Sequence, residues 1–143
     1  MSFNFSTMFP ITNDKTEYEL IEKDYVSLET FKNKNFLFIQ PEALKIITEN
    51  AFYKISHFYR SSHLKLLKKI LDDKEASKND HFVALTMLKN ANISASGVLP
   101  MCQDTGTAII NGYRGKNIIT DFNEEKEISR GIYNSYQNNN LRF

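Results

Sequence analysis

The sequence predicts an α+β fold in which several helices and small antiparallel strand pairs form a single domain. Its 143 residues are the length of one ordinary domain. Hydrophobic residues make up 41% of the chain and charged residues 24%, with only five Gly and three Pro, so we expect a packed core. Apolar residues recur at helical spacing, while β-branched and aromatic residues gather in shorter runs beside turn residues.

The N-terminal region predicts an arm followed by a hairpin. Residues 1–17 are polar and aperiodic, so we expect an arm there and the folded domain over residues 18–143. Between Tyr18 and Gln40, aromatic and β-branched residues recur around the polar centre Lys32–Asn35. This pattern predicts two short strands joined by a turn.

Helices dominate the rest of the prediction. The first is expected to begin at Pro41, because a helix accepts proline in its first turn. Ser61 or Ser62 is predicted to cap the second helix, and Asn79 or Asp80 the third. The expected helices span residues 41–60, 62–72, 80–92 and 124–137.

Three of these helices carry an apolar face. Its members are Leu44, Ile47, Ala51, Ile55 and Phe58 on the first, Leu64, Leu67 and Leu71 on the second, and Phe82, Leu85 and Leu88 on the third. On the second helix, the leucines are expected to point inward. The interleaved lysines are then better explained as a solvated helix face than as an RNA site.

A second strand pair is predicted before the last helix. Thr107–Asn111 and Lys116–Thr120 are β-prone, and they flank Gly112–Gly115. The glycines permit the positive φ angles of a tight turn, so this segment has the signature of a hairpin. The run Asn138–Asn140 is expected to end the last helix.

Charge and hydropathy narrow the function classes. Eighteen Lys and Arg against seventeen Asp and Glu give a net charge of +1, without the basic signature of a nucleic-acid or membrane-surface protein. The N-terminus has no signal or transit pattern, and apolar stretches are far shorter than the roughly 20 residues of a bilayer span. The single cysteine excludes an intramolecular disulfide and fits a reducing compartment. We therefore expect a soluble intracellular protein with no nucleic-acid or membrane partner.

Candidate chemistry concentrates in the loop Gly97–Ala108, which reads GVLPMCQDTGTA. A thiol, an amide, a carboxylate and hydroxyls crowd this loop between two apolar elements, as in many functional loops. From the residues alone, Cys102 fits an inert buried thiol, and Asp104 fits a carboxylate that shapes the turn. The three histidines lack zinc-site spacing and are expected at the surface or between helices.

The run Gly97–Ile110, GVLPMCQDTGTAII, resembles the cluster-binding segment of the class I fumarate hydratases, which are iron–sulfur hydro-lyases. The similarity continues in order through flanking runs and covers nearly the whole chain from about Phe9. These runs are Pro41–Leu44, Ala51–Phe52, Ile55–His57, Leu71–Asp73, Glu75–Ser77, Phe82–Leu85, Leu88–Ile93, Ser129–Tyr133 and Asn140–Phe143. An ordered match of this length is more specific than any short motif, so the sequence is identified as a member of this family.

The resemblance implies a catalytic [4Fe-4S] cluster held by three cysteines, whose open iron acts as a Lewis acid toward a small dicarboxylate substrate. Cys102 would be one of the cluster ligands. Gln103 and Asp104 would lie beside the substrate: the amide donates hydrogen bonds without adding charge, and the carboxylate acts as acid, base or orienting group. Arg142 would clamp a substrate carboxylate with its planar fork, which lysine lacks.

The implied parent enzyme reversibly hydrates fumarate to (S)-malate, a tricarboxylic acid cycle reaction, as a homodimer in the cytoplasm or mitochondrion. The family's other two cluster cysteines and its C-terminal domain lie beyond the position of Phe143, so these residues alone are expected to be inactive. Three alternatives stay open: a related iron–sulfur hydro-lyase acting on tartrate, a non-catalytic interaction module left by truncation, and a soluble α+β domain with an inert thiol.

Overall fold

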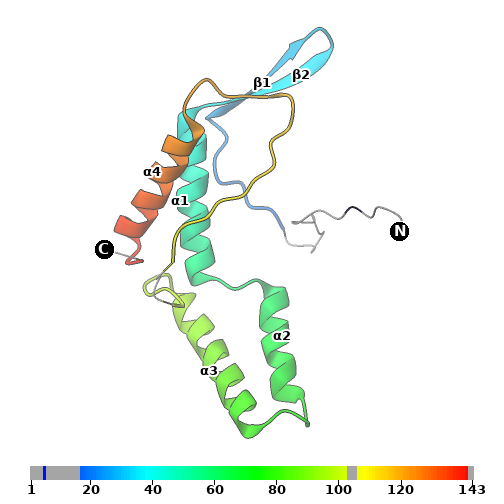
Figure 1. Cartoon of the computed structure of the whole chain (residues 1–143), viewed down its shortest axis with the longest axis vertical. Coiled ribbons are helices and arrows are strands. Elements are labelled where there is room, and N and C mark those ends of the chain that lie inside the picture. The colour runs from blue at the N-terminus through cyan, green and yellow to red at the C-terminus, as the bar shows by residue number, and fades with distance from the viewer. Residues whose placement is uncertain (1–4, 6–16, 103–105, 142–143) are drawn as a thin grey trace.

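The fold is α+β, as predicted, with a helical body and a small sheet (Figure 1). The computed structural model describes residue 5, residues 17–102 and residues 106–141. Its elements are β1 (Val26–Phe31), β2 (Lys34–Ile39), α1 (Pro41–His57), α2 (Ser61–Asp72), α3 (Lys78–Ser94), β3 (Ile118–Ile119) and α4 (Glu124–Asn138). The proposed arm, residues 1–17, lies mostly outside the described residues, so its boundary stays a prediction.

β1 and β2 form the first predicted hairpin. Their antiparallel pairing ends with Phe31 opposite Lys34, which leaves a two-residue turn. Lys32 and Asn33 in this turn have φ angles of 48° and 60°. Two positive φ angles define a type I′ turn, whose twist matches that of the paired strands. Both strands are short, as predicted, with six residues each, and β1 begins at Val26.

The second predicted hairpin is wrong. Residues 107–111 form no strand, and β3 instead joins the outer edge of β2, where Ile118 pairs with Leu37 in parallel. The Leu37 N–H also donates to the Asn117 carbonyl at 2.9 Å. Since β1 occupies one edge of β2, the other edge offers backbone groups that need partners, and β3 supplies them. The glycines between the two runs do not take the positive φ angles that a tight turn requires.

α1 ends at His57, earlier than the predicted residue 60. The carbonyls of a last helical turn lack intrahelical donors, and here two distant segments supply them. The Met101 N–H donates to the Ser56 carbonyl at 2.8 Å, and the Ser94 hydroxyl donates to the His57 carbonyl at 2.9 Å. Phe58 is then extended, so these tertiary contacts take the place of a further turn.

The helix caps differ in part from those predicted. Ser77, rather than Asn79 or Asp80, is the N-cap of α3. Its hydroxyl accepts from the Asp80 N–H at 3.2 Å, and the Asp80 carboxylate accepts from the Ser77 N–H at 2.9 Å, which is a capping box. α2 begins at Ser61 itself, without a side-chain cap. Asn123 caps α4, close to the expected start.

α1 and α4 lie side by side and pack closely (Figure 1). Thr48 on α1 is 6% exposed, and Ser135 on α4 is fully buried. Gly131 faces the α1 backbone so closely that an added Cβ would lie 2.5 Å from the Lys45 carbonyl oxygen. Small side chains therefore allow the two helix axes to approach.

Much of the apolar surface is not buried within this chain. Leu67 of α2 points inward as predicted, against α3, where Ala84 is buried. The apolar faces predicted on α1 and α3 lie at the surface instead: Ile47 is 52% exposed, Ile55 65% and Phe82 67%. These helices bury mainly their small and polar residues.

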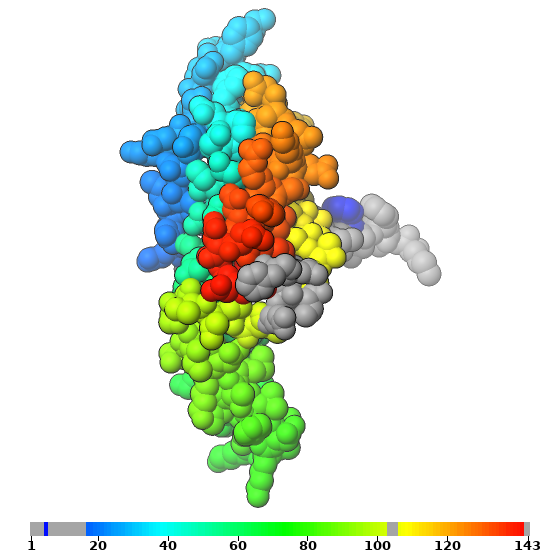
Figure 2. Space-filling view, turned by 90° about the vertical axis from the view of Figure 1, so that its left-hand side faces the viewer, coloured from blue at the N-terminus to red at the C-terminus, as the bar shows by residue number. Residues whose placement is uncertain are grey.

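The described elements form an elongated body rather than a compact one (Figure 2). The β1–β2 hairpin projects at one end, and the α2–α3 pair projects at the other (Figures 1 and 2). Within the part of the chain that the structure describes, no helix is long and apolar enough to span a bilayer.

Candidate functional site

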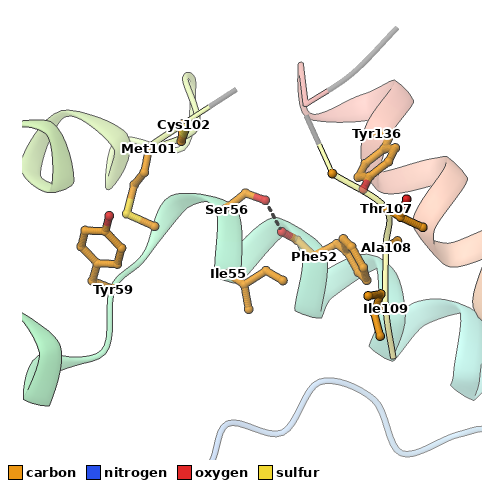
Figure 3. Close-up of a pocket in the computed structure, with 11 residues that line it drawn as sticks. Phe52, Ile55, Ser56, Tyr59, Met101, Cys102, Thr107, Ala108, Ile109 and Tyr136 are labelled. Atoms are coloured by element: carbon orange, nitrogen blue, oxygen red, sulfur yellow. Dashed lines mark hydrogen bonds between the residues drawn. The ribbon is translucent and has the colours of Figure 1, made fainter. Parts of the chain in front are cut away.

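A cavity of about 590 Å³ lies where three segments meet beside the C-terminal half of α1 (Figure 3). α1 contributes one wall, the loop after α3 a second and residues 106–109 a third. Its lining includes Phe52, Ile55, Ser56, Met101, Cys102 and Tyr136. The lining is mixed, since aromatic rings and aliphatic groups alternate with hydroxyl groups and one thiol.

Cys102, the cluster ligand implied by the resemblance, is exposed at this cavity. It is therefore not the buried inert thiol of the alternative interpretation. The residue before it is held from two sides: the Met101 N–H donates to the Ser56 carbonyl at 2.8 Å, and the Asn90 side-chain amide donates to the Met101 carbonyl at 2.5 Å. The thiol thus follows directly on a backbone segment fixed by α1 and α3.

A buried polar junction joins these two helices. The Ser94 hydroxyl, in a residue only 1% exposed, donates to the His57 carbonyl of α1. The His57 ring is fully buried and lies against Tyr53, at 4.5 Å between ring centroids. Its Nδ1 lies 2.8 Å from the Tyr53 carbonyl, so Nδ1 carries the proton and donates. Nε2 has no hydrogen-bond partner in the described part of the chain.

The other predicted site residues fall outside the described residues. These are Gln103, Asp104 and Arg142, and their roles stay predictions. Their chain neighbours are described: Cys102 and Gly106 both line the cavity, on either side of residues 103–105. Leu141, which precedes Arg142, is buried at 3% exposure.

Sequence reasoning missed several residues at the cavity. Tyr59 and Tyr136 bring aromatic rings to it, and Ser56 brings a hydroxyl that donates to the Phe52 carbonyl at 2.7 Å (Figure 3). Ser56 and Asn90 both occur in runs that carry the family resemblance. Nothing in those runs indicated that either residue contacts the backbone at Met101, because the contacts join segments far apart in sequence.

The other two histidines lie away from the buried junction. The His63 ring packs against Tyr59, at 4.7 Å between centroids, and the His81 Nε2 lies 2.9 Å from the Asp73 carbonyl. Among the described residues, no three His, Cys, Asp or Glu side chains come close enough together to hold a metal ion.

One carboxyl group with a shifted pKa, that of Asp80, lies at the end of α3 that is far from the cavity. Hydrogen bonds from the Ser77 hydroxyl and backbone N–H lower the pKa of the Asp80 carboxyl. α3 spans Lys78–Ser94, about 25 Å at 1.5 Å per residue, so this carboxylate stabilises the helix start rather than the site.

Comparison of the sequence with known proteins identifies its family. The family model of the fumarate hydratases, described as "Fumarate hydratase (Fumerase)", matches residues 45–143. The chain is 45% identical to the anaerobic class I fumarate hydratase of Escherichia coli K12 and 47% identical to fumarate hydratase 1, mitochondrial, of Leishmania major. Each match covers 99% of this chain and 26% of the relative, so the chain spans about a quarter of their length. The chain belongs to the fumarate hydratase (Fumerase) family.

Proposed function

We propose that these 143 residues are the N-terminal part of a [4Fe-4S] hydro-lyase that reversibly hydrates fumarate to (S)-malate. Identity of 43–47% to fumarate hydratases over 99% of the chain supports this assignment. The observation that carries it is the position of Cys102, exposed at a cavity that can hold a small dicarboxylate. The substrate and activity are those of the relatives' names, brought to this chain as a proposal.

This chain can supply one of the cysteine ligands of an iron–sulfur cluster, but not all of them. Thiolates are the ligands that iron–sulfur clusters take, and the sequence has a single cysteine. Cys102 therefore supplies one ligand, and the two others come from the part of the polypeptide that continues this chain. When bound, the cluster supplies a Lewis-acidic iron for the substrate.

The chain's own residues bind and orient the substrate beside this ligand. Gln103 donates to a substrate carboxylate or hydroxyl without adding charge, and Asp104 moves or orients a proton. Arg142 pairs with a carboxylate through two parallel N–H groups. Tyr136 lines the described cavity. Its ring is apolar and excludes water from a small anion, while its hydroxyl group is polar.

The rest of the polypeptide also covers apolar surface that this chain leaves exposed. Ile55 and Phe82 are more than half exposed on faces with helical apolar spacing. The complete enzyme forms a homodimer and works in the cytoplasm or the mitochondrion; one relative carries a mitochondrial name.

A chimera tests this function directly. Residues 1–143 replace the corresponding N-terminal segment of the Escherichia coli anaerobic class I fumarate hydratase, and the purified protein is reconstituted anaerobically with iron and sulfide. We expect the chimera to hydrate fumarate, which is measured as a loss of fumarate absorbance, and to turn over little tartrate. Turnover of tartrate in preference to malate would assign the tartrate reaction instead. A folded, cluster-loaded chimera without either activity would reject the proposed function.

The 143-residue chain on its own serves as the second arm of this experiment. Because it has one thiol, it should retain no stable cluster and show no turnover after the same reconstitution. Stable cluster formation with turnover would contradict the division of ligands between this chain and the rest of the polypeptide.

A further inference from the structure

We propose that Asn90 is a positioning residue for Cys102. By donating to the Met101 carbonyl, the Asn90 amide fixes the peptide that leads into the cysteine and so sets where the thiol stands at the cavity. The inference rests on the proposed function, in which Cys102 ligates the cluster, but the hydrogen bond and its effect on the thiol can be measured without any cluster.

Met101 is held at both of its backbone polar groups by different helices. Its carbonyl accepts from Asn90 of α3 at 2.5 Å, and its N–H donates to the Ser56 carbonyl of α1 at 2.8 Å. A loop residue held at only one group can still rotate about the remaining bonds. Two bonds to two separate helices remove that freedom and define the direction in which the chain enters Cys102.

A further hydrogen bond joins the two helices that hold Met101, close to both of the groups that bind it. Ser94 follows Asn90 by four residues, so both lie on the same face of α3. The Ser94 hydroxyl donates to the carbonyl of His57, the residue after Ser56. The positions of the two groups that hold Met101 are therefore fixed relative to each other by a buried hydrogen bond.

The side chain of Met101 lines the cavity together with residues of α1 and the segment after it. Figure 3 shows it between Tyr59 and Ser56, with Cys102 on the turn above. The next residue, Cys102, is exposed and lines the same cavity. A metal ligand on a loop needs such support, because a ligand displaced by as little as 1 Å binds its metal poorly.

The inference depends on the N–H donor of the Asn90 side chain and not on the size of that side chain. Asn90→Asp keeps the shape of the side chain but removes the N–H donor and sets a carboxylate against the Met101 carbonyl. Asn92→Asp is the matched control, because it makes the same charge change at an exposed position of α3. A role in packing alone would be insensitive to the Asn90→Asp exchange.

A nitroxide label on the single cysteine of the 143-residue chain measures the effect. In the electron paramagnetic resonance spectrum, we expect Asn90→Asp and Asn90→Ala to shorten the rotational correlation time of the label at least about twofold, because the Met101 carbonyl loses its hydrogen bond to α3. Asn92→Asp should match the wild type. Circular dichroism on each variant checks that the helices remain folded. Unchanged label mobility in a folded Asn90→Asp variant would overturn the inference.

A second measurement needs no variant. In the wild-type chain, nuclear magnetic resonance should show the side-chain amide protons of Asn90 exchanging at least about tenfold more slowly than those of exposed Asn92. Equal exchange rates would overturn the inference even if the variants do not fold. Failure of the chimera to bind a cluster, with both of these results as expected, would reject the proposed function and leave the positioning of Cys102 by Asn90 intact.

Discussion

Gly131 of α4 lies so close to Thr48 of α1 that a Cβ added at the glycine would stand 2.8 Å from the Thr48 Cβ. The same Cβ would lie 2.5 Å from the Lys45 carbonyl oxygen and 3.1 Å from the Glu49 amide nitrogen. Two of these three neighbours are backbone atoms, which cannot rotate away as a side chain can. The close contact between α1 and α4 therefore depends on the absence of a side chain at residue 131.

Gly131→Ala should lower the free energy of unfolding by about 1–3 kcal/mol, the usual cost of overpacking. Urea unfolding followed by circular dichroism measures it. Gly112→Ala is the matched control, because a Cβ there meets nothing within 4 Å. Equal stability of the two variants would show that α1 and α4 are not in close contact.

Gly97→Ala should destabilise the loop that leads to Cys102. Gly97 has a φ angle of +77°, and its added Cβ would meet the Tyr53 hydroxyl. A left-handed conformation costs an L-residue about 1–2 kcal/mol, which should appear in the same urea experiment. Gly115→Ala, where the nearest atoms lie at an ordinary 3.6 Å, should leave stability nearly unchanged.

The capping box at α3 predicts a dependence of stability on pH. The Asp80 carboxyl has a lowered pKa because Ser77 donates to it, so the folded chain holds this proton less tightly than the unfolded chain. Its contribution is present above the unfolded value of about 3.9 and is lost as pH falls through the lower, folded value. The difference in unfolding free energy between wild type and Asp80→Asn should therefore shrink below about pH 4.

Ser77→Ala removes the partner and tests the cause of this effect. Loss of an N-cap serine costs about 1 kcal/mol at neutral pH. If Ser77→Ala kept the acid dependence of the wild type, the Ser77 hydrogen bonds would not be the source of the lowered Asp80 pKa.

A substitution at Ile47 tests whether the exposed face of α1 is covered when this chain is part of the chimera. Its side chain is 52% exposed in this chain, so Ile47→Gln should change the unfolding free energy of the 143-residue chain by less than about 0.5 kcal/mol. In the chimera the same change should cost about 1–3 kcal/mol, because it buries an amide without partners. Lys65→Gln, on the solvated face of α2, should have little effect in either protein. An equally small effect of Ile47→Gln in both proteins would show that this face of α1 stays exposed in the chimera.

Local signals explain what the sequence predicted correctly. Pro41 can begin a helix and has no N–H to lose, so the start of α1 could be predicted from its own residues. Lys32 and Asn33 lie between two β-prone runs, which indicated a turn there. The end of α1 could not be predicted in this way, because its last carbonyls bind Met101 and Ser94, residues far along the chain.

Long-range partners also explain the second hairpin and the site. Ile118 pairs with Leu37, about 80 residues earlier, and no pattern within Thr107–Thr120 encodes that choice. The resemblance singled out Cys102, and the structure has it at the cavity. Asn90 gave no signal of its own, because an asparagine on a helix shows its role only when its partner is known.

The most direct test of the account is the iron content of the chimera with and without Cys102. After anaerobic reconstitution, we expect about four iron atoms per polypeptide in the wild-type chimera and loss of the cluster, by iron analysis and visible absorption, in Cys102→Ser. The exposed Ser96→Ala variant should retain the wild-type content. A full cluster in folded Cys102→Ser would show that this cysteine is not a ligand, and it would contradict the central claim.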